Sequence, residues 1–295
     1  MTLVISVLEQ GLIYSLAALG IYITYRILDF PDLTVDGSFP LGAAIAAVMI
    51  MHGVPAIVTL PVSFLAGALS GLATGLIHVK LRVRDLLAGI IVMTALYTVN
   101  LRLMGKANLP LYTVKTVFDN KFVNSIPLKA AAPLRTTLVL LVIVLIIKAL
   151  LDWYLKTRSG MVLRAAGSNP KIVTALGLDE GRIKIRGLMI ANGLCAFSGC
   201  LFAQQQRYAD VSMGTGTMVV ALASVIIGIS LLGRFRFPGI TAAVIIGSVI
   251  YKACVAAAVH FLKNADDMKL ITAVLFLIIL VVSMDKKRKV AGQDA

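Results

Sequence analysis

The chain has 295 residues, of which 59% are hydrophobic and only 14% are charged, and its mean hydropathy is +0.94. A soluble domain of this composition would expose large apolar patches, so the composition excludes a soluble globular protein and indicates an integral membrane protein. The net charge of +14 does not indicate a nucleic-acid partner, because no soluble stretch is long enough for such a domain and basic loops beside membrane spans explain the charge.

Apolar runs of about 20 residues predict membrane-spanning α-helices rather than the alternating strands of a β-barrel. We therefore expect an all-α polytopic membrane protein, a single transmembrane domain over residues 1–295, with about nine spans and a range of roughly eight to ten. The first basic residue is Arg26, so the first run lacks the charged leader of a cleavable signal peptide and should remain as a span. The expected spans are 3–25, 35–52, 55–79, 86–105, 136–155, 186–206, 215–233, 237–261 and 268–284.

A broken helix is expected between Arg26 and Gly42, where the chain reads RILDFPDLTVDGSFPLG. Its aspartates, prolines and glycines would be costly against lipid and are tolerated only against protein or a water-filled cavity, as in the translocation path of transporters. The alternative is a cytoplasmic loop that leads into a shorter helix. The polar residues that could line a substrate pathway are Asp32, Thr34, Asp36, Ser38, Asn100, Asn192 and Gln204. Glu9 and Arg102 lie near outer span ends, where they either pair or are simply exposed.

In the third span Gly67, Gly71 and Gly75 recur at four-residue intervals, a spacing that permits close helix packing. The loop 106–134 is too polar to span and too short for a domain. It is either a solvated extracytoplasmic loop or a contact surface for an extracellular partner.

The loop 157–186 contains a short helix with both ends marked. Ser168 or Asn169 can cap its N-terminus, Pro170 suits the first helical position and Gly177 suits the C-terminal stop. A helix of about seven residues is roughly 10 Å long and cannot cross a bilayer, so we expect a docking element at the membrane surface.

Lys and Arg predict the orientation. If the 157–186 loop is cytoplasmic, most of the 28 basic residues lie on that side, which places the N-terminus outside and the C-terminus inside. The basic tail 285–295 is then a cytoplasmic segment. A loose parallel between Gly11–Pro55 and Gly187–Pro238, each with a span, a polar break and an apolar run, predicts two inverted halves joined by the fifth span.

No sequence feature indicates catalysis. The chain lacks a nucleotide-binding Gly-x-x-x-x-Gly-Lys-Ser/Thr loop, a Gly-x-Ser-x-Gly motif and a His-Glu-x-x-His motif, and its three cysteines fall in apolar runs without metal-ligand spacing. We expect no catalytic residues and no metal site. Transport is therefore favoured over the alternative of a membrane enzyme that acts on lipid.

Two segments carry a resemblance to a known family. Asp32-Leu33-Thr34-Val35-Asp36-Gly37-Ser38 is similar to the Asp-Leu-Ser-Val-Gly-Ser segment of sugar permeases, with Asp36 interrupting the match. Gly160, Ala165, Gly167, Asn169 and Gly177 match the cytoplasmic loop of the same family. The chain resembles the permease subunit of bacterial ABC importers of the branched-chain amino acid and ribose type. It is most similar to a branch associated with tryptophan- or tyrosine-type binding lipoproteins.

The resemblance implies a division of labour in the bacterial inner membrane. An extracytoplasmic binding lipoprotein delivers the substrate, two permease chains (a homodimer by expectation) form the pathway, and cytoplasmic ABC ATPases bind ATP and Mg, so that this chain holds no cofactor. The implied substrate is an amino acid, aromatic by preference, or a similar small polar solute. The residues expected to couple to the ATPase are Arg164, Gly167, Ser168, Asn169, Pro170, Lys171, Ile172, Val173, Leu176 and Gly177.

Within this loop, Ile172, Val173 and Leu176 would form an apolar face that enters a groove on the ATPase, while the basic side chains meet acidic surface. The alternative function is an ion-coupled secondary transporter, which would also contain a broken helix but would need no ATPase. Its ion or proton site would be Asp29, Asp32 or Asp36.

Overall fold

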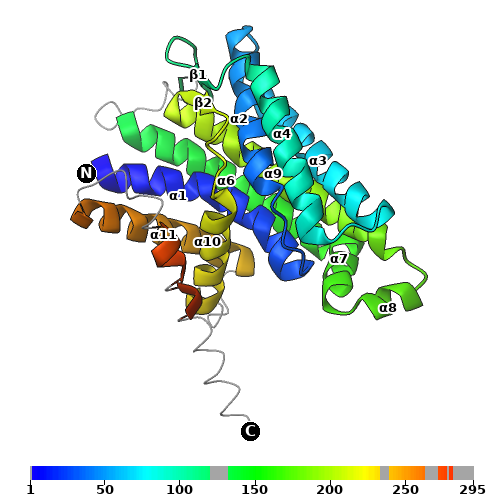
Figure 1. The fold of residues 1–295 in the computed structure, drawn as a ribbon. Helices are drawn as coiled ribbons and strands as arrows, with labels where there is room; N and C mark the ends of the chain where they lie inside the picture. Colours follow the sequence, from blue (N-terminus) through cyan, green and yellow to red (C-terminus); the bar gives the residue numbers. More distant parts are fainter. Residues whose placement is uncertain (1, 120–131, 233–238, 263–271, 278, 282–295) are drawn as a thin grey trace.

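A computed structural model describes residues 2–119, 132–232, 239–262, 272–277 and 279–281, and most of them are helical (Figure 1). A π-helical turn, η1 (Tyr22–Ile27), extends the first helix, and a 3-10 turn, η2 (Val117–Asp119), lies in the longest loop. The labelled helices are α1 (Thr2–Ile21), α2 (Val35–Met51), α3 (Ala56–Lys80), α4 (Asp85–Met104), α6 (Ala132–Lys156), α7 (Arg158–Ser168), α8 (Pro170–Ala175), α9 (Glu180–Gln206), α10 (Thr217–Leu232) and α11 (Ile240–Leu262). The basic tail 285–295 lies outside the described residues.

Six described helices are long and apolar enough to cross a membrane: α1 with η1, α3, α4, α6, α9 and α11. The other three predicted spans coincide with shorter apolar helices, namely α2, α10 and Thr272–Val281. α2 has 17 residues and α10 has 16. At 1.5 Å per residue they measure about 26 and 24 Å, less than the roughly 30 Å hydrocarbon core. A polytopic helical protein is confirmed, while nine crossings remain a prediction.

α9 lies at the centre of the bundle. In the apolar segment of α9, 78% of the residues are buried, and in that of α1 67% are buried. The corresponding fraction is only 22% in α4 and in α6, which lie at the periphery. Glycines let the neighbouring helices approach the α9 backbone. A methyl group at Gly71 would collide with the carbonyl of Leu188, and one at Gly42 with that of Ala196. Gly67 and Gly75 also face α9, so the predicted close packing of these glycines is confirmed.

Both of the most buried helices are followed by an irregular segment and a short helix. Residues 28–34 separate η1 from α2, and residues 211–216 lie between the second strand and α10. In Figure 1, α2 runs toward one end of the molecule and α10 toward the other, and both begin inside the bundle. An irregular segment thus lies where the break was predicted, as both the broken helix and the alternative of a loop leading into a shorter helix require, and a corresponding irregular segment follows α9.

One end of the molecule carries a two-stranded antiparallel sheet that the sequence did not predict. β1 (Asn108–Pro110) pairs with β2 (Tyr208–Asp210), with Leu109 opposite Ala209. The sheet joins the loop after α4 to the end of α9. The first part of the predicted 106–134 loop is thus ordered against the bundle, and its residues 120–131 lie outside the described part.

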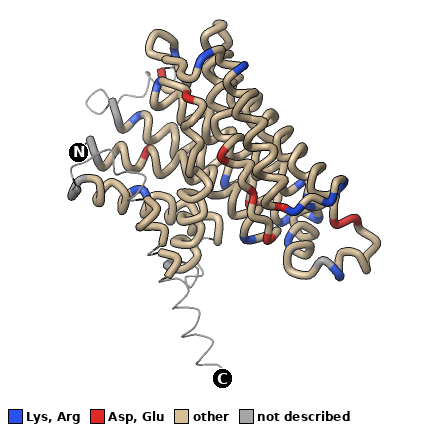
Figure 2. The backbone as a smooth tube through the Cα atoms, viewed as in Figure 1, with Lys and Arg blue, Asp and Glu red and all other residues tan. Residues whose placement is uncertain are grey.

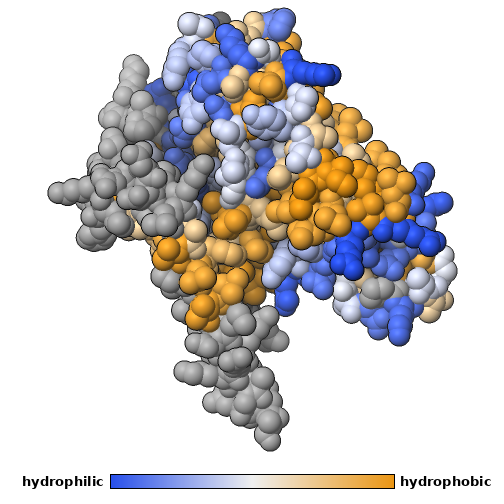
Figure 3. All heavy atoms as spheres, viewed as in Figure 1, coloured by the Kyte–Doolittle hydropathy of each residue, from blue (hydrophilic) through white to orange (hydrophobic). Residues whose placement is uncertain are grey.

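α7 and α8 occupy the opposite end. α9 begins directly after α8 and ends directly before β2, so its 27 residues separate the two ends by about 40 Å. Lys and Arg residues cluster around α7, α8 and the turn between α3 and α4 (Figure 2). An apolar surface over α3 and α4 lies between the two polar ends, as expected of a lipid-facing belt (Figure 3).

Candidate functional site

The broken segment is held to α9 by a buried polar network. Asp32 is 2% exposed and its carboxylate accepts hydrogen bonds from the Thr34 backbone N–H (2.9 Å) and from Nδ2 of Asn192 (2.6 Å). Oδ1 of Asn192 accepts a hydrogen bond from Oγ of Ser38 at 2.9 Å. Thr34 also shares a 2.7 Å hydrogen bond with Thr74 on α3. Four predicted pathway residues, Asp32, Thr34, Ser38 and Asn192, therefore lie in one network that joins α2, α3 and α9.

Asp36 joins the two irregular segments to each other. Its carboxylate accepts hydrogen bonds from the backbone N–H groups of Gly216 (3.0 Å) and Met218 (2.8 Å) at the start of α10. A carboxylate at a helix N-terminus satisfies unpaired N–H groups and complements the helix dipole. A side chain at Gly214 would collide with the Asp36 carbonyl and the Pro40 ring, so the two breaks are in direct contact. The first turns of α2 and α10 thus meet at Asp36 within the bundle.

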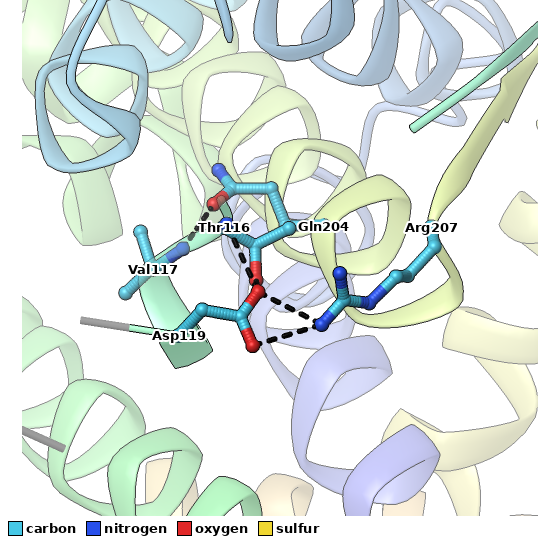
Figure 4. Close-up of polar contacts among 5 residues, drawn as sticks. All are labelled: Thr116, Val117, Asp119, Gln204 and Arg207. Atoms are coloured by element: carbon cyan, nitrogen blue, oxygen red, sulfur yellow. Dashed lines mark hydrogen bonds and ion pairs between the residues drawn. The ribbon is translucent and has the colours of Figure 1, made fainter. Parts of the chain in front are cut away.

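The two remaining pathway candidates differ, because Asn100 contacts the same segment and Gln204 lies away from it. Asn100 is fully buried and donates from Nδ2 to the Gly37 carbonyl at 3.2 Å, while its Oδ1 has no partner in the described part of the chain. Gln204 lies near the β1–β2 end. Its Oε1 accepts from the Val117 N–H at 3.0 Å (Figure 4). Its Nε2 donates to Thr59 on α3 at 3.0 Å, so Gln204 fixes the loop to the bundle.

The same loop is fixed by an ion pair. Arg207, which ends α9 with a φ of +62°, donates to both oxygens of Asp119 at 2.9 and 2.8 Å (Figure 4). Burial raises the pKa of the Asp119 carboxyl, but the hydrogen bonds from Thr116 and the charge of Arg207 outweigh it, and the pKa lies below its ordinary value. This pair was not predictable from sequence, because 88 residues separate its members.

Glu9 does not pair with Arg102. Its carboxylate accepts from Gln205 at 2.9 Å and from Thr137 at 3.3 Å, whereas Arg102 is exposed. Of the two alternatives, the ion pair is wrong, because Glu9 faces α6 and α9 rather than α4, and simple exposure holds for Arg102 but not for the buried Glu9.

An aromatic cluster with a cation was missed by the sequence analysis. The Tyr14 ring stacks on Phe39 with 5.5 Å between centroids and meets Phe202 edge-on at 5.6 Å. Nζ of Lys252 on α11 lies 3.6 Å from the Tyr14 ring centroid, a cation–π contact. Lys252 makes no ion pair with any described residue. The one usable signal was a lysine inside an otherwise apolar run, since an ionisable group within a span is functional by default.

The 157–186 loop contains two helices rather than one. Arg158–Ser168 forms α7, which Thr157 caps, and Pro170–Ala175 forms the shorter α8. Ser168 is the last residue of α7, so of the two predicted caps Asn169 is the actual one: its Oδ1 accepts from the Lys171 N–H at 3.1 Å. Gly177, with a φ of +72°, ends the segment as predicted, and Leu178 N–H closes the turn on the Val173 carbonyl at 3.1 Å.

The predicted apolar face of α8 is divided. Val173 is fully buried in the same core cluster as η1 and α9, while Leu176 is 68% exposed. The structure does not describe the Ile172 side chain. Arg164 and Lys171 are exposed beside this surface. One side chain therefore holds α8 to the bundle, and another is free to contact a partner.

α7 lies directly against the segment that precedes the break. A methyl group at Gly167 would collide with the carbonyl of Ile27. A methyl group at Gly187 of α9 would collide with the Leu28 side chain and with the Leu163 side chain of α7. α7, η1 and α9 are packed without room for a side chain at these two glycines, so α7 is in direct contact with the residues that lead to Asp32.

Comparison with known proteins identifies the family. Residues 3–283 match the family described as the permease component of the branched-chain amino acid transport system. The chain belongs to this permease family. It is 44% identical over 277 residues to the tyrosine transport system permease protein of Clostridioides difficile. The alignment covers 94% of this chain and 90% of that protein. No solved structure matches the chain significantly.

More distant relatives lie in the same superfamily. The chain is 25% identical over 271 residues to the ribose import permease protein of Haemophilus influenzae, covering 90% of this chain and 77% of that protein. It is 27% identical over 228 residues to a probable branched-chain amino acid transport permease of Methanocaldococcus jannaschii, covering 72% and 70%. The chain is thus a permease component of an ABC-type transporter and not an enzyme, as the resemblance of its two motifs implied.

Proposed function

We propose that this permease forms the membrane pathway of an ATP-driven importer and that α8 transmits the movement of a cytoplasmic ATPase to the broken segment. The observation that carries the proposal is the close contact between Gly167 of α7 and the Ile27 carbonyl. This contact joins α7, which directly precedes α8, to the segment 28–34 and so to the Asp32 network. Among the described residues, no group of three or more His, Cys, Asp or Glu could hold a metal ion.

The basic end of the molecule is, in this proposal, the cytoplasmic side. The clustering of Lys and Arg around α7 and α8 supports it, because cytoplasmic loops carry an excess of positive charge. The N-terminus is then outside and the β1–β2 sheet faces the extracytoplasmic binding lipoprotein. The contact of α2 and α10 at Asp36 supports two inverted halves, since each half contributes one broken helix to the centre.

The ion-coupled alternative has less support. Asp32 and Asp36 are occupied by internal hydrogen bonds, and Asp29 is exposed at the end near α7 with a φ of +52°. The ATP-driven class also agrees with the family of the chain.

The substrate that we propose is an aromatic amino acid. The tyrosine permease relative supports it, and so does the ammonium group of Lys252, which lies over the buried Tyr14 ring without an ion-pair partner among the described residues. An unpaired ammonium attracts a carboxylate. We expect cells that express the complex to take up labelled tyrosine, with competition by phenylalanine and tryptophan and none by ribose.

A pair of variants tests the docking of the ATPase. Leu176→Asp places a charge on the exposed apolar position of α8 and should prevent co-purification of the ATPase with the permease. Leu81→Asp is the matched control, because Leu81 is 69% exposed in the turn between α3 and α4 on the same side of the molecule. Normal co-purification of Leu176→Asp, or equal loss in both variants, would contradict docking at α8. We expect a second permease chain to co-purify in both cases, as in a homodimer.

A further inference from the structure

A cavity of about 590 Å³ lies between the start of α7 and the start of α9. It is separate from the Asp32 network and borders the turn that follows α8. Its lining combines arginines with polar and apolar side chains: Tyr154, Arg158, Ser159, Val162, Leu163, Gly177, Leu178, Asp179, Arg182, Ile183 and Arg186.

The cavity carries excess positive charge. Three arginines line it against a single acid, Asp179. That acid is already engaged, because one oxygen accepts from the Gly181 N–H at 2.9 Å and the other pairs with Arg182 at 3.2 Å. Arg158 and Arg186 form no ion pair or hydrogen bond with any described residue. Two guanidinium groups are therefore available to a ligand, and their planar donor geometry suits phosphate oxygens.

One helix N-terminus reinforces this charge. α7 begins at Arg158 with no acidic residue in its first turn, and residues of that turn line the cavity, so the positive end of its dipole lies at the rim and favours an anion. The N-terminus of α9 also borders the cavity, but the Asp179 carboxylate already caps it. Ser159 adds a hydroxyl, which shares a 3.2 Å hydrogen bond with the Tyr154 hydroxyl.

Exposed side chains beside the cavity indicate that it lies at the level of the lipid headgroups. Trp153, which precedes the lining residue Tyr154, is 69% exposed, and aromatic side chains of this kind mark the membrane interface. On α6, Leu150 (55% exposed) and Ile146 (54% exposed) follow Trp153 at helical spacing toward the membrane interior. This apolar stripe offers acyl chains a path that starts beside the arginines.

We propose that this cavity binds the phosphate of an anionic phospholipid headgroup, held by Arg158 and Arg186. A free phosphate would satisfy the same arginines, but the exposed stripe on α6 and the interfacial Trp153 favour a lipid. The bound headgroup contacts α7 and the start of α9, which flank α8. Lipid binding therefore restrains the coupling element. This consequence rests on the proposed function, but the lipid-binding proposal itself is independent of it.

The test measures lipid binding by the purified full-length permease in detergent. Phosphatidylglycerol and phosphatidylcholine with identical acyl chains are titrated, and lipid adducts are counted by native mass spectrometry. Arg158→Gln/Arg186→Gln removes both proposed ligands. Lys80→Gln/Arg84→Gln is the control, because it removes the same charge from exposed positions in the turn between α3 and α4 on the same side.

We expect the wild type to prefer phosphatidylglycerol and the Arg158→Gln/Arg186→Gln variant to bind it about 100-fold more weakly, because each of the two direct, charge-assisted hydrogen bonds to the phosphate contributes about 1.5 kcal/mol and about 1.4 kcal/mol is tenfold. The control should bind it like the wild type. Equal weakening in both double variants would overturn the proposal, as would displacement of the lipid by millimolar inorganic phosphate. Unchanged lipid binding with loss of ATPase co-purification in the Arg158→Gln/Arg186→Gln variant would assign these arginines to the ATPase and also overturn it.

Discussion

Asn192→Ala should destabilise the permease more than the loss of an ordinary hydrogen bond. The Asn192 side chain donates to Asp32 at 2.6 Å and accepts from Ser38 at 2.9 Å, and it is fully buried. Alanine leaves the Asp32 carboxylate, itself 2% exposed, with hydrogen bonds from Thr34 alone among the described residues. A buried hydrogen bond to a charged group contributes about 1.5–3 kcal/mol, and the Ser38 hydroxyl, which keeps only a long 3.4 Å bond to the Val35 carbonyl, adds to this. We expect a loss of roughly 2–4 kcal/mol in the free energy of unfolding.

Unfolding of the purified protein in mixed micelles, titrated with SDS, measures this loss. Ser198→Ala is the matched control on α9, because it removes a buried neutral hydrogen bond (2.6 Å to the Ile13 carbonyl) and should lose only about 1 kcal/mol. Adding Asp32→Asn to Asn192→Ala should recover part of the stability, since no buried charge is then left unpaired. Equal losses in Asn192→Ala and Ser198→Ala, without recovery in the double variant, would refute the reasoning.

Three further predictions concern packing, the outer loop and the cation on α11. Gly199→Ala should lower the free energy of unfolding by about 1–3 kcal/mol, because its methyl group collides with the Phe39 carbonyl. Gly193→Ala on the same helix is the control, because its methyl group meets the Phe64 ring. Size-exclusion chromatography of heated samples compares the stability of the two variants. Asp119→Asn should increase hydrogen exchange at residues 116–119. Because the folded-state pKa of Asp119 is lowered, its stabilisation is present above the ordinary carboxyl pKa and lost as the pH falls through the lowered value, a loss that Asp119→Asn should not show. Lys252→Met should reduce tyrosine uptake more than Lys252→Arg, and equal uptake by both would argue against a carboxylate contact.

The sequence predicts most of the helical framework because span length and apolar composition are local properties. The break before α2 was predictable from Asp32, Pro31 and Gly37, which are costly in lipid. The caps at Asn169 and Gly177 were equally local, since each acts on the backbone of its own turn. α7 was missed although Thr157 caps its first turn, because Gly160 and Gly167 lower the helix propensity of this segment.

Contacts between distant segments were not predictable. Asn192 lies 160 residues from Asp32, and Asp36 lies 180 residues from Gly216, so only the folded chain brings them together. Gln204 was grouped with the pathway because it is polar, yet its amide fixes the loop at Val117. Val173 was assigned to a contact surface by its place on an apolar face, but the bundle buries that side chain. Polarity and periodicity identify such residues without identifying their partners.

ATP-driven tyrosine uptake by the Gly167→Val variant, measured per assembled complex, tests the coupling claim most directly. The valine side chain must displace α7 from the Ile27 carbonyl, while Leu176 stays free to contact the ATPase. We predict that the variant retains its ATPase partner and hydrolyses ATP but loses uptake. Uptake at the wild-type rate, with the complex intact, would contradict transmission from α8 through α7 to the broken segment.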